Sequence, residues 1–270
     1  MSTSFDTIDE KIAEVEFFLR KMCDPGYNSQ EFKWYFSAFL SAARTSTLVL
    51  QRFQHDVPGF SKWYAPHQKR LAKNELAKHF LDMRNDHVHG GDYPVGGASI
   101  IQKDVKFFFP RENITVESKL NETDIVAASR DYFIELLKVV YDCYMKLGIH
   151  FDPQQYYTKE NYKDGINKAE CEVCGWVCTT LIEEGFTRDG RWRELRSRVG
   201  ACQINHLFYG YLDKVTPQPI EPEGFEDFAY TYEERGWEHV PAGFSSLKAY
   251  RRWFRQNKSI KRSKKVVDGE

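Results

Sequence analysis

Apolar residues recur at helical spacing in four long segments of the first 150 residues, and this periodicity limits the fold more than any other feature of the chain. The segments span residues 5–24, 30–54, 67–89 and 124–147. A helix with a single apolar stripe is stable when that stripe is buried against neighbouring elements. We therefore predict a mainly α fold in which four long helices pack as a bundle.

The apolar period changes between the third and the fourth of these helices. The stretches "SIIQKDVKFFF" and "NITVESK" are rich in β-branched and aromatic residues and predict two strands, joined by "PRE". We expect a small β-hairpin inserted into the bundle at this point. Before the third helix, "HDVPGFSKWYAP" contains Pro and Gly and predicts a loop with aromatic anchors.

The chain divides into two predicted regions at about residue 150. Residues 1–150 hold the helical bundle, and "GIHFDPQQYYTKENY" predicts a linker into a second region, 151–270, of mixed or helical structure. Within this second region, residues 163–185 predict a helix, and the pattern weakens from about 186 onward. A last predicted helix, "SLKAYRRWFRQNK", leads into a basic tail.

Charge and composition exclude some classes of protein. The formal net charge is −1, so a nucleic-acid-binding role must depend on local patches. The N-terminus lacks the basic and apolar regions of a signal peptide, and no apolar run approaches the ~20 residues that a membrane helix needs. We expect a cytoplasmic protein that does not contact a membrane. Cys23, Cys143 and Cys202 are scattered through apolar helical segments, so we also expect reduced thiols.

The stretch "DMRNDHVHGG", residues 82–91, ends the third predicted helix with a dense set of polar groups. Arg and His are favoured at a helix C-terminus because the last carbonyls carry partial negative charge, and Gly is an ordinary stop signal. However, Arg84, Asn85, His87 and His89 offer more hydrogen-bonding groups than the end of a helix requires. The stretch is therefore a candidate functional site, with a structural helix end as the alternative.

The segment "RNDHVH" resembles the signature of the HEPN superfamily of helical bundles. That signature is an arginine, a polar residue that is often asparagine, and a histidine four to six residues after the arginine, near the end of the third main helix. Arg84, Asn85 and His89 occupy these positions. The resemblance covers about residues 1–150, and the predicted hairpin is an insertion relative to a minimal HEPN bundle.

The resemblance implies a metal-independent endoribonuclease, of the kind found in toxin–antitoxin systems, phage defence and RNA processing. The ribose 2′-hydroxyl attacks the adjacent phosphate, which leaves a 2′,3′-cyclic phosphate and a 5′-hydroxyl. In this scheme His89 is the general acid or base, Arg84 stabilises the phosphate and its transition state, and Asn85 is the positioning residue.

The spacing of these residues creates a geometric difficulty. Arg84 and His89 lie about 140° apart around an ideal helix. A site shared between the two chains of a homodimer removes the difficulty, and so does unwinding of the helix at Gly90–Gly91. His87 lies three residues from Arg84 and is the alternative catalytic histidine.

A second candidate site is a zinc site formed by Cys171, Cys174, Cys202 and His206. Its first two cysteines, in "CEVCGWVC", have the spacing of a zinc knuckle. The same segment also has the apolar period of an amphipathic helix, in which the cysteines are small buried residues. We favour the helix and predict no metal or other cofactor, with zinc as the alternative.

Two stretches are strongly basic. Residues 188–198 hold five arginines against two acids, and we expect a solvated helix surface there. Residues 251–265 hold eight basic residues, no acid and two aromatic residues. Basic groups neutralise phosphates and aromatic rings stack on unpaired bases, which favours RNA contact in the tail. The predicted RNA-binding residues are Arg251, Arg252, Trp253, Arg255 and Lys258. An acidic partner protein is the alternative.

The leading functional hypotheses differ in whether the bundle is catalytic. In the first, the chain is a homodimeric endoribonuclease that acts on RNA and has an antitoxin or another protein as a further partner. In the second, it is a non-catalytic module in which Arg84 and His89 bind RNA or a nucleotide, or seal a dimer interface. A zinc-stabilised adaptor is the third.

Overall fold

The computed structural model describes residues 5–24, 28–91, 93–101, 104–110, 123–161, 166–174 and 188–218, apart from the side chains of Gln54, Ile166, Asn167 and Cys174. These residues belong to one compact unit, Met1–Ile220, and the second unit, Glu221–Glu270, lies outside the described part of the chain. The described part is mainly helical with a small antiparallel hairpin, which confirms the predicted fold class. None of its helices is long and apolar enough to cross a membrane.

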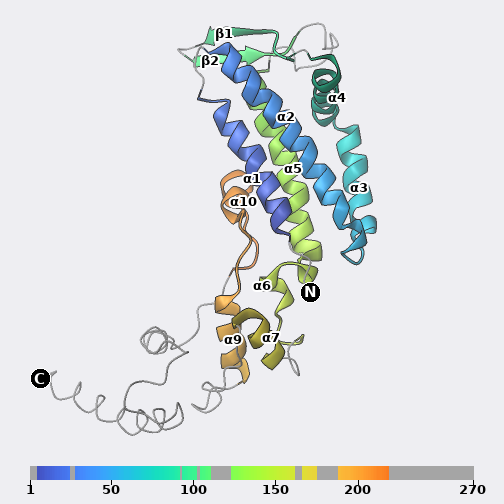
Figure 1. Ribbon diagram of the computed structural model, residues 1–270, viewed down its shortest axis with the longest axis vertical. Coiled ribbons are helices and arrows are strands. Elements are labelled where there is room, and N and C mark those ends of the chain that lie inside the picture. The colour runs from blue at the N-terminus through green and yellow to red at the C-terminus, as the bar shows by residue number, and fades with distance from the viewer. Residues whose placement is uncertain are drawn as a thin grey trace, which may run out of the picture. The chain divides into compact units, whose positions relative to one another are not determined.

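The first two predicted helices form as expected and pack along each other (Figure 1). They are α1, Asp6–Lys21, and α2, Ser29–Arg52, which is followed by the short 3₁₀ turn η1, Phe53–His55. Asn28 caps α2, because its side chain accepts a hydrogen bond from the Glu31 N–H at 3.1 Å. The facing surfaces are buried and apolar: Ile8, Ile12, Val15 and Leu19 from α1, and Phe32, Phe36, Phe39 and Leu40 from α2.

The prediction of a single third helix over 67–89 is wrong. The chain forms α3, Phe60–Lys73, and α4, Glu75–Gly90, on either side of Asn74. The Asn74 backbone is extended, and its side chain accepts a hydrogen bond from the Ala77 N–H at 2.9 Å. This residue therefore ends one helix and caps the next.

The predicted loop before the third helix is also wrong from Phe60 onward. Phe60 and Tyr64 are four residues apart on α3, and both are buried. Their shared face packs as a helix does, even though Pro66 lies inside α3 and removes one backbone donor. The aromatic residues that were expected to anchor a loop are the buried face of a helix.

The β-hairpin is formed mostly from the first of the two predicted strands. β1, Gly97–Ile101, pairs antiparallel with β2, Asp104–Phe108, so "SIIQKDVKFFF" contributes to both strands instead of forming one. The second predicted strand, "NITVESK", lies outside the described residues. Phe107 of β2 stacks on Phe32 of α2 with ring centroids 3.8 Å apart, which fixes the hairpin to the bundle.

α5, Ile125–Leu147, contributes the most extensive buried face, as its long apolar stripe predicts. It contacts α1, α2 and α4, and Figure 1 shows it running along the bundle beside them. Asp124 precedes it, and its Oδ1 accepts a hydrogen bond from the Phe107 N–H at 3.2 Å, which ties the start of α5 to β2. The core of the bundle therefore lies between α5 and the helices around it.

The segment after α5 packs against the bundle, so the prediction of a linker is wrong here. η4, Gly148–His150, leads into the single turn α6, Pro153–Tyr156, which Asp152 caps through the Gln154 N–H at 3.0 Å. Phe151 stacks on Phe5 with centroids 4.0 Å apart. Buried apolar contact of this kind holds the segment to the start of α1.

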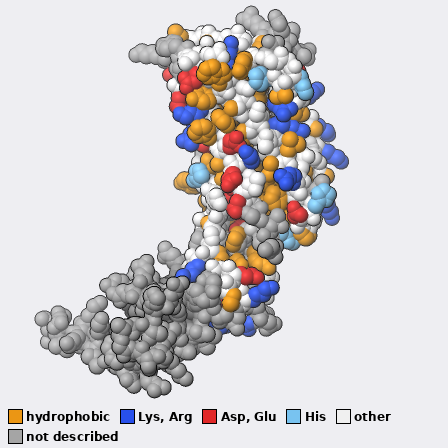
Figure 2. Space-filling view, viewed as in Figure 1, with side chains coloured by type: hydrophobic (Ala, Val, Ile, Leu, Met, Phe, Trp, Pro, Cys, Tyr) orange, Lys and Arg blue, Asp and Glu red, His pale blue; other side chains and the backbone are white. Residues whose placement is uncertain are grey.

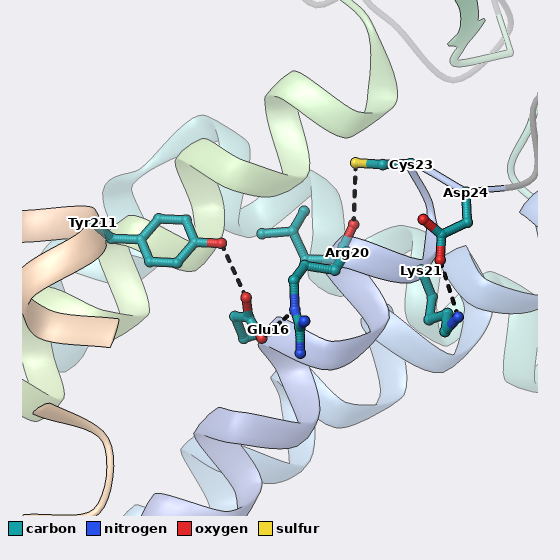
Figure 3. A network of polar contacts seen from close by, with 7 residues as sticks. Glu16, Arg20, Lys21, Cys23, Asp24 and Tyr211 are labelled. Carbon is teal, nitrogen blue, oxygen red and sulfur yellow. Dashed lines mark hydrogen bonds and ion pairs between the residues drawn. The ribbon is translucent and has the colours of Figure 1, made fainter. Parts of the chain in front are cut away.

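The described C-terminal region adds α7, Ile166–Cys174, α9, Arg188–Arg198, and α10, Asn205–Leu212. α10 packs on α5, where Phe208 meets the ring of Tyr144 edge-on at 5.8 Å. The Tyr211 hydroxyl also donates to Glu16 Oε1 of α1 at 3.4 Å, and Glu16 in turn pairs with Arg20 (Figure 3). Residues beyond the predicted boundary at 150 thus contribute directly to the packing of the bundle.

Candidate functional site

The candidate cluster occupies the last two turns of α4. The helix stays regular through Gly90, and Gly91 follows with a φ of 79° and donates its N–H to the His87 carbonyl at 2.9 Å. Glycine suits this left-handed conformation because it has no Cβ. The helix therefore does not unwind before Gly91, and Arg84 and His89 keep the angular separation of a regular helix.

Arg84 is half-buried and forms no ion pair with any carboxylate in the described ranges. Its Nη1 donates to Asn85 Oδ1 at 3.2 Å, and its Nε is enclosed by protein without a hydrogen-bond partner. The structure thus brings Arg84 and Asn85 together. A neutral amide does not cancel the charge of a guanidinium, so Arg84 keeps its capacity to bind an anion.

His87 connects α4 to α2. Its Nε2 shares a hydrogen bond of 2.6 Å with Ser37 Oγ, and its ring lies against Tyr93, with centroids 4.8 Å apart. The imidazole is half-buried and held in one orientation by these two contacts. The hydrogen bond between Ser37 and His87 was not predicted from the sequence.

His89 is exposed on the last turn of α4. Five residues separate it from Arg84, which places the two side chains about 140° apart around the helix. One chain therefore does not bring them together. By contrast, His87 is three residues from Arg84 and lies on the same side of α4.

His79, five residues before Arg84 on α4, is partly packed in the bundle. Its ring meets Phe109 edge-on at 5.0 Å, and its Nε2 is enclosed without a hydrogen-bond partner. Burial lowers the pKa of His79, and the nearby Asp82 carboxylate opposes that change. Burial therefore favours the neutral form of the His79 imidazole.

Basic side chains lie along the edge that α3 and α4 form, as Figure 2 shows for one face of the molecule. The exposed residues of this kind are Lys62, Lys69, Arg70, Lys73 and Lys78. Arg70 is paired with Glu135 of α5. This edge therefore carries positive charge that the Arg70–Glu135 pair neutralises only in part.

The proposed zinc ligands are not assembled among the side chains that the structure describes. Cys202 is buried, and its Sγ donates to Asp9 Oδ2 at 3.8 Å, whereas Cys171 and His206 are exposed. Within the described side chains, which exclude that of Cys174, no three His, Cys, Asp or Glu residues are grouped as a metal site requires. α7 does form over 166–174, as the helical alternative predicts.

The prediction of a solvated helix over 188–198 is wrong in one respect, because α9 buries part of its charge. Arg191 is buried and pairs with the buried Glu170 of α7. Arg196 donates to Gln154 Oε1 at 2.8 Å, and Arg193 pairs with Asp189 at 3.2 Å. The predicted RNA-binding tail lies outside the described residues.

A buried carboxyl group, which the sequence patterns did not single out, joins α1, α5 and the segment before α10. Asp9 accepts hydrogen bonds from the Tyr144 hydroxyl at 2.8 and 2.9 Å and from the Gln203 N–H at 3.2 Å. Burial raises the pKa of Asp9 to about 6, against the opposite effect of these donors. Its signal in the sequence is weak, because Asp9 stands beside Ile8 in a first helical turn where acids are common.

A family model described as bacteriophage lambda protein ea47 matches residues 3–149, which include α1 to α5 and the candidate cluster. No curated protein and no solved structure shows a significant match. The assignment to the HEPN superfamily is therefore wrong, since the model that covers the bundle belongs to another family. Arg, Asn and His at the end of a helix are a short pattern that ordinary C-terminal preferences also produce.

Proposed function

The chain belongs to the family of bacteriophage lambda protein ea47, and from the geometry of α4 we propose that its bundle binds RNA through phosphate groups. One observation carries this proposal. Arg84 is half-buried at the end of α4, next to Asn85, and has no acidic partner among the described residues. A guanidinium left without a counter-ion favours an anionic ligand.

The surroundings of Arg84 suit an anionic group, and in this proposal that group is a phosphate of RNA. The enclosed Nε is not open to a ligand, so the terminal nitrogens of the guanidinium donate to the phosphate oxygens. Asn85 holds its Nη1 at 3.2 Å and so limits its rotation. His89, exposed on the next turn, can add a further donor to a backbone that runs across the end of the helix.

The test is the binding of a fluorescein-labelled, single-stranded 20-nucleotide RNA, followed by anisotropy at two salt concentrations. We expect Arg84→Gln to weaken binding about tenfold and to reduce the salt dependence by about one phosphate contact. Arg20→Gln is the matched control, because Arg20 lies on α1, is 67% exposed and is paired with Glu16. Equal affinity of the wild type and a folded Arg84→Gln variant contradicts the proposal.

A second candidate function is metal-independent cleavage of the bound RNA, supported by the position of His87. His87 and Arg84 lie on one side of α4, and Ser37 fixes the imidazole at 2.6 Å. In the reaction, the 2′-oxygen loses its proton and bonds to phosphorus, while the bond to the 5′-oxygen breaks and that oxygen gains a proton. A histidine can transfer these protons, and Arg84 can stabilise the phosphorane.

Cleavage is tested on the same RNA in the presence of a chelator, with analysis of the new ends. Loss of 2′,3′-cyclic phosphate products in His87→Ala, but not in His89→Ala, assigns the acid–base role to His87. The reverse result assigns it to His89 of the partner subunit in a homodimer. If the wild type and every variant bind the RNA and leave it intact, the nuclease hypothesis is wrong. The non-catalytic RNA-binding function then remains.

A further inference from the structure

A cavity of about 470 Å³ lies where α2, α3, α4 and α5 meet. Its walls combine Arg44 and Gln51 from α2, Tyr64 from α3, Lys78 from α4 and Tyr132 from α5. This volume is within the range of pockets that hold small organic ligands. Neither Arg84 nor His87 lines it, so the pocket is independent of the RNA-binding proposal.

Two cations, Arg44 and Lys78, and one carboxylate, Asp82, line the pocket, which leaves an excess of one positive charge. Arg44 is half-buried, and its one hydrogen bond from the side chain within the described ranges goes to Thr47 Oγ1 at 3.4 Å. Lys78 forms no ion pair with the described acids, and that includes Asp82, four residues further along α4 and also in the wall. The excess positive charge in a partly enclosed space favours an anionic group.

Tyr132 adds a neutral donor to these cations. Its ring stacks on Phe80 with centroids 4.9 Å apart, and its hydroxyl has no hydrogen-bond partner in the part of the chain that the structure describes. Burial raises the pKa of Tyr132 to about 12, although Arg44 acts in the opposite direction. The phenol therefore stays protonated at neutral pH and can donate to a ligand in the pocket.

A second hollow in the described surface differs from this pocket in the residues that line it. It measures about 400 Å³ and is lined by the consecutive residues 55–62 of a single segment. It does not bring together groups from several helices. The pocket at Arg44 does so, and it also has apolar surface from Leu71 and Leu81 beside its polar groups.

We propose that the pocket at Arg44 binds a small organic anion, in which a carboxylate or a phosphate is attached to an aromatic or other apolar body. The anionic group lies between Arg44, Lys78 and the Tyr132 hydroxyl. The apolar body covers Leu71 and Leu81 on the α3 and α4 walls. The charge of the head group provides affinity, and the apolar wall selects against inorganic anions.

Calorimetric titration of the full chain with three probes tests this proposal. The probes are 2-naphthoate, 2-naphthyl phosphate and neutral 2-naphthol, which share one ring system. We expect at least one anion to bind and 2-naphthol to bind at least about tenfold more weakly. The tighter of the two anions identifies the preferred head group.

Substitutions place the bound probe in the pocket. Arg44→Gln is expected to weaken binding of the anion about tenfold or more, and Tyr132→Phe about threefold, because the ring still stacks on Phe80. Lys69→Gln is the matched control, since Lys69 is an exposed cation of α3 outside the pocket wall, and it should leave the affinity unchanged.

Two results overturn the proposal. One is the absence of saturable binding of either anion to the folded wild-type chain. The other is wild-type affinity in both Arg44→Gln and Tyr132→Phe. If circular dichroism shows that Arg44→Gln does not fold, Lys78→Gln takes its place, because Lys78 is exposed and its loss leaves the core intact.

Discussion

Arg191 and Arg84 are both withdrawn from solvent, but only Arg191 is neutralised within the fold. Arg191 of α9 pairs with Glu170 of α7 through two hydrogen bonds, Nε to Oε1 at 2.9 Å and Nη2 to Oε2 at 2.6 Å. Arg84 of α4 donates a hydrogen bond to the Asn85 amide and forms no ion pair with an acid in the described ranges. The arginine-rich segment of the sequence thus uses its charge internally, whereas an isolated arginine of the bundle keeps its charge for a ligand.

The comparison extends to the neighbours of each arginine. In α9, Glu194 pairs with Arg198 and Asp189 pairs with Arg193, so acids of the same helix neutralise several of its cations. In the bundle, Arg44 and Lys78 share one cavity and neither forms an ion pair with a described acid. Charge density along the sequence is therefore a poor guide to which cations are free to bind a ligand.

The largest expected effect is that of breaking the Glu170–Arg191 pair. Glu170→Gln removes the carboxylate that the buried Arg191 guanidinium pairs with, and breaking a buried ion pair costs about 3–5 kcal/mol. Hydrogen exchange in the peptide that covers α9 should become faster by a factor of about 10²–10⁴.

Two variants sharpen the comparison with Arg84. Glu170→Leu combined with Arg191→Leu should restore most of the protection of α9, because an apolar pair of similar volume can replace a buried ion pair. Arg84→Gln should change the stability of the bundle by about 1 kcal/mol or less, since no ion pair with a described group is lost. Slow exchange of α9 in Glu170→Gln contradicts the assigned role of the pair.

The second-largest expected effect is the pH dependence of stability caused by Asp9. Asp9 is a buried carboxyl group whose described hydrogen-bond partners are uncharged donors. Its pKa is about 6 in the folded chain and 3.8 as an ordinary carboxyl group, so the folded state binds the proton more tightly. The stabilisation is fully present below pH 3.8 and is lost as the pH rises through 6. The difference of about two pH units corresponds to about 3 kcal/mol.

Urea unfolding of the wild type and of Asp9→Asn between pH 4 and pH 7 measures this effect. The amide keeps an acceptor for Tyr144 and does not titrate, so the variant should gain about 2.4 kcal/mol relative to the wild type between pH 4 and pH 7. A difference between the two proteins that does not vary with pH means that Asp9 is already ionised in the folded state at pH 4.

The smallest expected effect concerns the contact between Ser37 and His87. Ser37→Ala removes one half-buried hydrogen bond between α2 and α4, which costs about 1 kcal/mol. Ser41→Ala, one turn further along α2, should change stability by less than about 0.5 kcal/mol. Equal unfolding midpoints for the two variants mean that Ser37 does not hold the imidazole.

Much of the fold follows from periodicity alone. The helices α1, α2 and α5 form where apolar residues recur at helical spacing, because burying one stripe is the main source of stability in such helices. The break at Asn74 was not predicted, since good helix formers surround it and only its extended backbone reveals the cap. Phe60 and Tyr64 were assigned to a loop because Pro and Gly stand nearby, and packing outweighed that local signal.

The candidate site was predictable only in part. The neighbours Arg84 and Asn85 are adjacent in sequence, so their contact on one helix needs no tertiary information. The Ser37–His87 bond joins residues 50 positions apart, and the pocket at Arg44 needs four helices to converge. The short pattern "RNDHVH" located a cluster of polar groups but assigned the chain to the wrong family.

The sequence by itself determined the long helices α1, α2 and α5, their apolar faces and where basic residues are dense, because these properties depend on neighbours within a few residues. Only the tertiary structure decided which cations are neutralised. Glu170 reaches Arg191 across 21 positions, whereas no described carboxylate forms an ion pair with Arg84 or Arg44. Ion pairing depends on distances of a few ångströms between distant parts of the chain, and packing alone sets those distances.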